Sequence, residues 1–224
     1  MLVDLNADLG EGAGHDGGWM CEITSANVCC GAHAGGPDHM RATVALAQRH
    51  GVVIGAHPGY ADRANFGRVE MALEPHEVKS LCFRQIAALI AVGAEVKYLK
   101  PHGALYHQAM RDEGTAWGVA QAAAAFSLPC VGLAGSWLEK VCDAFVPEGF
   151  ADRRYRPDGT LVPRGQPDAM IADVREAVEQ VEGLIGPRGV RTVCLHGDHP
   201  AALGFVRAIR AALLERGHAL WAFA

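Results

Sequence analysis

The chain has 224 residues, of which 50% are hydrophobic and 20% charged, so its composition is that of a globular protein with a sizeable core. Its net charge is −5 and its lysines and arginines form no cluster, so we expect neither nucleic acid nor an anionic membrane as a partner. The longest apolar stretch, Ile86 to Ala94, is about half of the roughly 20 residues that a membrane span requires.

The first residues and the cysteines suggest where the protein resides. Polar residues begin at Asp4, which leaves no room for the hydrophobic region of a signal peptide. The seven cysteines are an odd number and include no Cys-x-x-Cys pair, so we expect buried thiols rather than disulfides or metal ligands. These features predict a protein of the reducing cytoplasm.

Apolar runs and helical periodicity alternate along the chain. They predict seven strands, near residues 1–8, 23–30, 52–56, 96–99, 130–133, 145–151 and 192–195. Helices are expected between them, at residues 37–50, 75–92, 112–126, 136–144, 168–185 and 201–216. Residues 10–18 are rich in glycine and are expected to form only a loop.

This alternation favours a parallel sheet covered by helices. We expect one domain over residues 1–224, an α/β fold closed as a distorted seven-stranded (β/α) barrel. Such a barrel is slightly smaller than the roughly 250 residues typical of eight strands. An open doubly wound sheet is the alternative.

Polar residues recur where the predicted strands end. Histidine follows an apolar run beside glycine or proline four times, at His33, His57, His102 and His196, and Lys100 ends the fourth strand. Asp4, Asn6 and Asp8 alternate along the first strand and therefore point the same way. Active sites of (β/α) barrels lie at the carboxyl ends of the strands, so we expect these side chains to converge.

Several sequence blocks resemble the LamB/YcsF family, and the resemblance extends over nearly the whole chain. The blocks are DLNADLGEG from Asp4, SANVCCGAHAG from Ser25, GAHPGY from Gly55, KPHGALY from Lys100, FADR from Phe150, DGTLVPR from Asp158 and VCLHGD from Val193. Two features depart from the family pattern: residues 12–21 form a short segment, and Gly36 stands where an aspartate usually precedes the proline. The region before the seventh strand also looks trimmed.

The resemblance implies a seven-stranded barrel related to carbohydrate deacetylases and a role as the A subunit of a multi-subunit 5-oxoprolinase. That enzyme opens 5-oxo-L-proline to L-glutamate with ATP, together with Mg²⁺, as co-substrate. Catalytic candidates are Asp8 or Glu11 as base, Lys100 as an anion clamp, and His33, His57, His102 and His196 in acid–base or positioning roles. Substrate-binding candidates are Asn6, Asn27, Arg68, Arg153 and Asp198. Replacing Lys100 by Met is expected to abolish turnover with little loss of fold.

The chain shows no Walker A pattern, so ATP activation is expected to depend on another protein. The resemblance points to companion subunits B and C, and the long loops at residues 60–71 and 155–166 are the expected docking surfaces. Self-association is left open.

Two other functions compete with this one. A metal-dependent hydrolase of the deacetylase kind could bind zinc or a similar ion through Asp8, His33 and His57, although no histidine pair has the i, i+4 spacing of a helical metal motif. A ligand-binding or scaffold subunit without catalytic activity is the third possibility.

Overall fold

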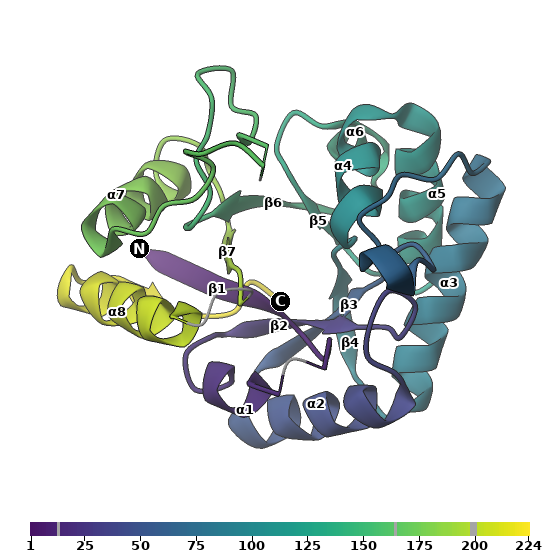
Figure 1. Cartoon of the computed structure of the whole chain (residues 1–224), viewed down its shortest axis with the longest axis horizontal. Coiled ribbons are helices and arrows are strands. Elements are labelled where there is room, and N and C mark those ends of the chain that lie inside the picture. The colour runs from purple at the N-terminus through teal and green to yellow at the C-terminus, as the bar shows by residue number, and fades with distance from the viewer. Residues whose placement is uncertain (13, 164, 198–200) are drawn as a thin grey trace.

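The computed structural model describes residues 1–12, 14–163, 165–197 and 201–224. Seven parallel strands form a closed barrel, because β1 pairs with β2 on one side and with β7 on the other (Figure 1). In chain order they are β1 (Leu2–Leu9), β2 (Ser25–Cys29), β3 (Val53–His57), β4 (Val96–Leu99), β5 (Cys130–Gly132), β6 (Phe145–Phe150) and β7 (Thr192–Leu195). The expected seven-stranded barrel is confirmed, and the open sheet is excluded.

Helices surround the barrel, as Figure 1 shows. They are α1 (Asp16–Trp19), α2 (Pro37–His50), α3 (Pro75–Ala91), α4 (Gly103–Arg111), α5 (Glu113–Ala124), α6 (Trp137–Val141), α7 (Val174–Ile185) and α8 (Ala202–Glu215). A short 3₁₀ helix, Arg63–Asn65, lies in the loop after β3, and β8 (Ala219–Leu220) pairs with the start of β1. None of the described helices is long and apolar enough to cross a membrane.

Local sequence signals explain where the main helices begin and which face they bury. Pro75 opens α3 inside a capping box formed by Glu74 and Glu77, and Gly51 ends α2 in the left-handed conformation. The apolar stripe of α3 is fully buried, and α3 packs on helix α5 as well as on strands β3 and β4 of the barrel; the stripe consists of Val78, Cys82, Ile86 and Leu89. Burial of such a stripe is the main stabilisation of a helix in a globular protein.

Two differences from the expected elements have physical causes. Residues 16–19 form a helical turn rather than a plain loop, because Trp19 is buried and the Asp16 carboxylate accepts hydrogen bonds from Gly10 (3.0 Å) and Thr43 (2.6 Å). These tertiary contacts outweigh the poor helix propensity of two glycines. Helix α7 begins at Val174 rather than near 168, since the Asp173 carboxylate caps it at the amide of Glu176.

Two further elements were not expected from the sequence: α4, which starts directly after His102, and the two-residue β8. The buried side chains of α4 include Leu105 and Ala109, which have the i, i+4 spacing of a helix face.

Gly55 leaves room for the ring of Tyr98 inside the barrel. A Cβ at Gly55 would lie 2.1 Å from the Tyr98 ring, and that ring is fully buried. The Tyr98 hydroxyl donates to Asn27 Oδ1 at 2.6 Å. This hydrogen bond and the close contact with Gly55 fix the position of the ring. A side chain at position 55 would therefore disturb the barrel interior below the polar strand ends.

We expect Gly55→Ala to lower the free energy of unfolding by about 1–3 kcal/mol, the usual range for overpacking a core. Gly183→Ala is the matched control, because Gly183 lies in α7 with no atom within 4 Å of an added Cβ. The control is expected to gain about 0.5–1 kcal/mol from helix propensity. Urea denaturation of the two variants measures both values, and equal stability of the two would contradict this account of Gly55.

Candidate functional site

The carboxyl end of the barrel brings together the polar side chains that end the strands. Asp8 lies near the end of β1, His57 ends β3, and Lys100 and His102 follow β4. Asp8 Oδ2 lies 3.4 Å from His57 Nε2, and Asp8 Oδ1 lies 3.3 Å from Lys100 Nζ. His57 Nε2 lies 3.0 Å from His102 Nδ1. Because all seven strands are parallel, residues from distant parts of the chain form one cluster.

Lys100 is buried at the centre of this cluster and is balanced by protein carboxylates. Its Nζ lies 2.7 Å from Glu148 Oε1 and 3.3 Å from Asp8 Oδ1, and it donates to Cys194 Sγ at 3.0 Å. The side chains of Lys100 and Glu148 are 3% and 0% exposed. The sequence suggested that Lys100 needs a bound anion, but Glu148 and Asp8 already supply the negative charge from within the protein.

Asn6 and Asn27 connect the cluster to the barrel interior. Asn6 Nδ2 donates to the Thr192 hydroxyl at 2.6 Å, and Asn6 Oδ1 accepts from Asn27 at 2.7 Å and from Lys100 at 3.1 Å. Asn27 also donates to Asp8 Oδ1 at 2.8 Å. Both asparagines are buried and bonded to protein groups. This geometry favours a role in positioning Lys100 and Asp8 over the substrate contact expected from the sequence.

The histidines form a stacked group next to Asp8. The rings of His33 and His102 are parallel within 2°, with centroids 3.7 Å apart, and His57 meets His102 edge-on at 4.9 Å. Glu11 closes the group from the solvent side, with Oε1 at 3.3 Å from His33 Nε2 and 3.5 Å from His102 Nδ1. Three imidazoles and two carboxylates thus share one small volume.

Charge pairing divides these groups into charged and neutral ones. Burial acts to raise the pKa of Asp8, but the charges of His57 and Lys100 outweigh it and hold that pKa well below its usual range. Burial acts to lower the pKa of His57 and of Lys100, and Asp8 outweighs it in both, so both pKa values are raised. Burial, followed by the charge of His57, lowers the pKa of His33 to about 3 and that of His102 to about 2.

His196 is oriented by Asp152. Its Nδ1 lies 3.0 Å from both carboxylate oxygens of Asp152, and its backbone amide donates to Asp152 Oδ2 at 2.8 Å. Its ring stacks on Phe150 with 6° between the planes. His196 also belongs to a group, with Asp8 and Cys194, whose ligand atoms lie within 4.8 Å of one another. A carboxylate on one ring nitrogen fixes the orientation of an imidazole that transfers protons at the other.

Three residues of this site were missed as candidates: Glu148, Asp152 and Cys194. Glu148 was recognisable as a carboxylate inside the apolar run of β6, and Asp152 as a carboxylate two residues after that strand ends. Cys194 lies within the apolar β7, where a buried cysteine usually serves packing, so no sequence signal distinguished it.

The two arginine candidates contact a neighbouring loop and an aromatic ring. Arg153 is buried and donates to the backbone oxygen of Val162 at 2.7 Å, so it holds the following loop. Arg68 is exposed, with its guanidinium carbon 5.2 Å from the centre of the Phe66 ring. Asp198 lies outside the described residues.

Potential metal ligands occur in three overlapping groups among the described residues. The groups are Asp8–His57–His102, Asp8–Cys194–His196 and Glu11–His33–His102, each with ligand atoms within 4.8 Å of one another. The set expected from the sequence, Asp8 with His33 and His57, is not one of them. In the structure, His102 rather than His33 joins Asp8 and His57 in a group of potential ligands.

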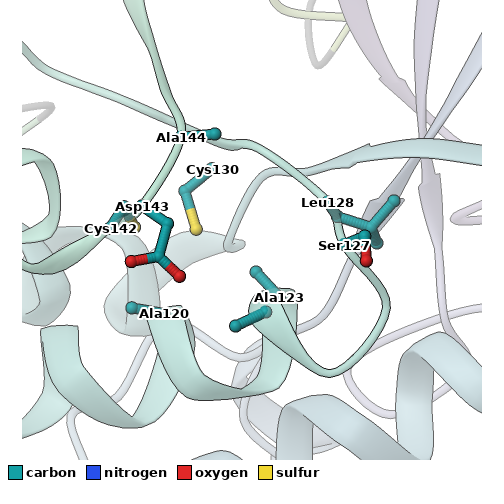
Figure 2. Close-up of a pocket in the computed structure, with 9 residues that line it drawn as sticks. Ala120, Ala123, Ser127, Leu128, Cys130, Cys142, Asp143 and Ala144 are labelled. Carbon is teal, nitrogen blue, oxygen red and sulfur yellow. The ribbon is translucent and has the colours of Figure 1, made fainter.

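A surface pocket of about 310 Å³ lies away from this cluster. Figure 2 shows its lining, which includes Cys130, Cys142 and Asp143 together with small side chains at the end of α5. Cys130 is the first residue of β5, so the pocket opens near the amino end of the strands, opposite the histidines. It contributes nothing to the candidate site.

The pairing of Lys100 changes what its substitution should do. We expect Lys100→Met to destabilise the protein by about 3–5 kcal/mol, because Glu148 would be left as an unpaired buried charge. The double variant Lys100→Met/Glu148→Gln should recover most of that loss. Thermal and urea denaturation test this. A Lys100→Met protein as stable as the wild type would contradict this account and agree with the expectation from sequence, which was little loss of fold.

Comparison with known proteins agrees with this architecture. The family model described as "LamB/YcsF family" matches residues 3–224. Two proteins named as the A subunit of 5-oxoprolinase, from Methylococcus capsulatus and Neisseria meningitidis, are 46% and 45% identical, with 96% of this chain and 93% and 97% of theirs covered.

Solved structures extend the comparison. The "Lactam Utilization Protein" of Thermus thermophilus is 40% identical, with a TM-score of 0.91 and full coverage of both chains. A family 4 carbohydrate esterase from Streptomyces lividans is 15% identical, with a TM-score of 0.54 over 100% of this chain and 93% of its own, and it resembles this chain in fold alone. From the family match and the near-complete coverage of its relatives, the chain belongs to the LamB/YcsF family.

Proposed function

We propose that this chain is the A subunit of an ATP-dependent 5-oxoprolinase, which opens 5-oxo-L-proline to L-glutamate. The observation that carries the proposal is the match, at 41–46% identity over 96% of the chain, to proteins that bear the name of this 5-oxoprolinase component. The polar cluster at the barrel mouth supports it, because that cluster supplies carboxylates and imidazoles at a place a small substrate can reach. The cytoplasmic location expected from the cysteines stays a prediction.

The chemistry explains why ATP is needed. The lactam amide is resonance-stabilised, and the product re-closes easily because its amine and carboxylate belong to one molecule. Transfer of the γ-phosphoryl group of ATP to the amide oxygen makes the ring carbon electrophilic. Water then adds to that carbon, the ring C–N bond breaks, and the nitrogen leaves with a proton. A second water releases phosphate, so two waters are consumed for one glutamate, one ADP and one phosphate.

The residues at the exposed edge of the cluster are suited to the hydrolytic steps of this reaction. The side chains of Asp8, Glu11 and His196 are 17%, 18% and 12% exposed, whereas those of His57 and Lys100 are 1% and 3% exposed. We assign His196, oriented by Asp152, as the group that accepts a proton from the attacking water, in place of Asp8 or Glu11, which the sequence had suggested as the base. Asp8 and Glu11 hold the water and the polar atoms of the ring.

Activation by ATP is assigned to companion subunits B and C, with Mg²⁺ accompanying the nucleotide. The loops at residues 60–71 and 155–166 are the docking surfaces that we propose. The first loop borders the histidines directly, because the backbone oxygen of Phe66 accepts a hydrogen bond from His102 Nε2 at 2.8 Å. A companion bound there would close over the substrate.

The partner requirement is tested by measuring glutamate formation from 5-oxoproline and ATP with Mg²⁺. The chain alone should give no activity, and the chain with subunits B and C should give ATP-dependent glutamate. Activity from the single chain would contradict the partner requirement. Full activity of B and C without this chain would contradict its role in ring opening, and would favour a scaffold.

The assigned proton acceptor gives a second test in the same assay. We expect Asp152→Asn to lower kcat by about 10²–10⁴-fold, the usual contribution of a general base, because the amide can no longer orient His196 as the carboxylate does. The control is Asp38→Asn, the same change at a side chain that is 93% exposed on α2. Unchanged kcat in Asp152→Asn, with a normal melting temperature, would remove His196 from this role.

A further inference from the structure

Two buried imidazoles direct their free nitrogens at the same point. His57 Nδ1 lies 2.8 Å from the backbone oxygen of Lys100, and His102 Nε2 lies 2.8 Å from that of Phe66. A carbonyl oxygen only accepts hydrogen bonds, so each of these two nitrogens carries the hydrogen. The opposite nitrogens, His57 Nε2 and His102 Nδ1, are the ones that face each other at 3.0 Å.

A carboxylate oxygen joins them. Asp8 Oδ2 lies 3.4 Å from His57 Nε2, while the other oxygen, Oδ1, is held by Asn27 at 2.8 Å and by Lys100 at 3.3 Å. In the neutral imidazoles, two nitrogen lone pairs and an anionic oxygen would converge with nothing between them. Such an arrangement is repulsive unless a cation lies among the three atoms. The cation is either a single proton, which the raised pKa of His57 favours in the metal-free chain, or a metal ion that replaces this proton and is bound by all three groups.

The spacing and the outer partners fit a metal ion. Zinc bonds of about 2.0–2.2 Å in tetrahedral geometry place ligand atoms roughly 3.3–3.6 Å apart. His57 Nε2 lies 3.4 Å from Asp8 Oδ2 and 3.0 Å from His102 Nδ1, and both separations are close to that range. The ligand atoms of all three residues lie within 4.8 Å of one another. Both histidines donate their other N–H to a backbone carbonyl, and the carboxylate is itself hydrogen-bonded, which is how metal ligands are usually oriented.

The surrounding backbone holds the rings in place. A Cβ at Gly67 would lie 3.2 Å from His102 Cδ2, and one at Gly59 would lie 3.2 Å from His102 Cβ. His57 and His102 are only 1% and 5% exposed. The donor atoms are therefore preorganised, and Asp8 and Glu11 connect the site with solvent.

From these contacts we infer that Asp8, His57 and His102 bind one divalent transition-metal ion, with zinc the best match for two imidazoles and a carboxylate. Three protein ligands leave further coordination positions open. His33, a candidate metal ligand in the sequence, instead directs Nε2 at Glu11. The inference goes beyond the proposed function and does not depend on it, because binding is measured without substrate.

The test is calorimetry of the chelator-treated full chain with ZnCl₂ at neutral pH, together with visible absorption after addition of CoCl₂. We expect one ion per chain and the d–d bands of a site of low coordination number. His102→Gln and Asp8→Asn keep the side-chain volume and should each lower the affinity for zinc by more than about 100-fold. Loss of a residue that only hydrogen-bonds to a ligand typically lowers metal affinity by about 10- to 100-fold. His76→Ala, at an exposed histidine of α3, should bind as the wild type does.

Absence of binding to the folded wild type would overturn the inference and assign the position to a shared proton. Wild-type affinity in either His102→Gln or Asp8→Asn would overturn it as well, because the ion would then be held by other residues, such as Glu11 with His33 and His102. Circular dichroism of the metal-free variants establishes that each is folded. Glutamate formation with subunits B and C is a separate readout, so failure of the metal site and failure of the proposed function are distinguishable.

Discussion

The buried ammonium of Lys100 is the charge on which the mouth of the barrel depends. A cation that is 3% exposed is too costly to bury alone, and here Glu148 at 2.7 Å and Asp8 at 3.3 Å compensate it. Glu148 lies in β6, Asp8 lies in β1 and Lys100 directly follows β4, so the ion cluster forms only when the barrel has closed. Fold and site therefore depend on one another.

This pairing also determines the charge that faces solvent. Asp8 is shared between Lys100 and His57, and their charges hold the pKa of its carboxyl well below its usual range. The neighbouring His33 and His102 have lowered pKa values, because burial and the charge of His57 both disfavour further protonation. In the metal-free chain, a small substrate at the mouth would thus meet the carboxylates of Asp8 and Glu11, while the ammonium of Lys100 is more deeply buried.

Much of this arrangement could be predicted from residue pattern. Apolar runs located all seven barrel strands, and histidine beside glycine or proline marked the strand ends that converge. The partners across the barrel could not be predicted, because the pairing of Lys100 with Glu148 spans β4 and β6 and depends on side-chain geometry that no local pattern records. For the same reason Asn6 and Asn27 looked free for substrate, whereas each is bonded within the protein. The turn at Asp16–Trp19 escaped prediction since distant contacts, rather than propensity, stabilise it.

The central claim of this account is that 5-oxoproline is opened at the mouth of this barrel. The most direct measurement is a crystal structure of the chain assembled with subunits B and C and bound to 5-oxoproline. The account predicts the ring within hydrogen-bonding distance of Asp8, Glu11 or His196, at the carboxyl ends of the strands. A ring bound only to a companion protein, or in the pocket beside Cys130 and Cys142, would contradict it.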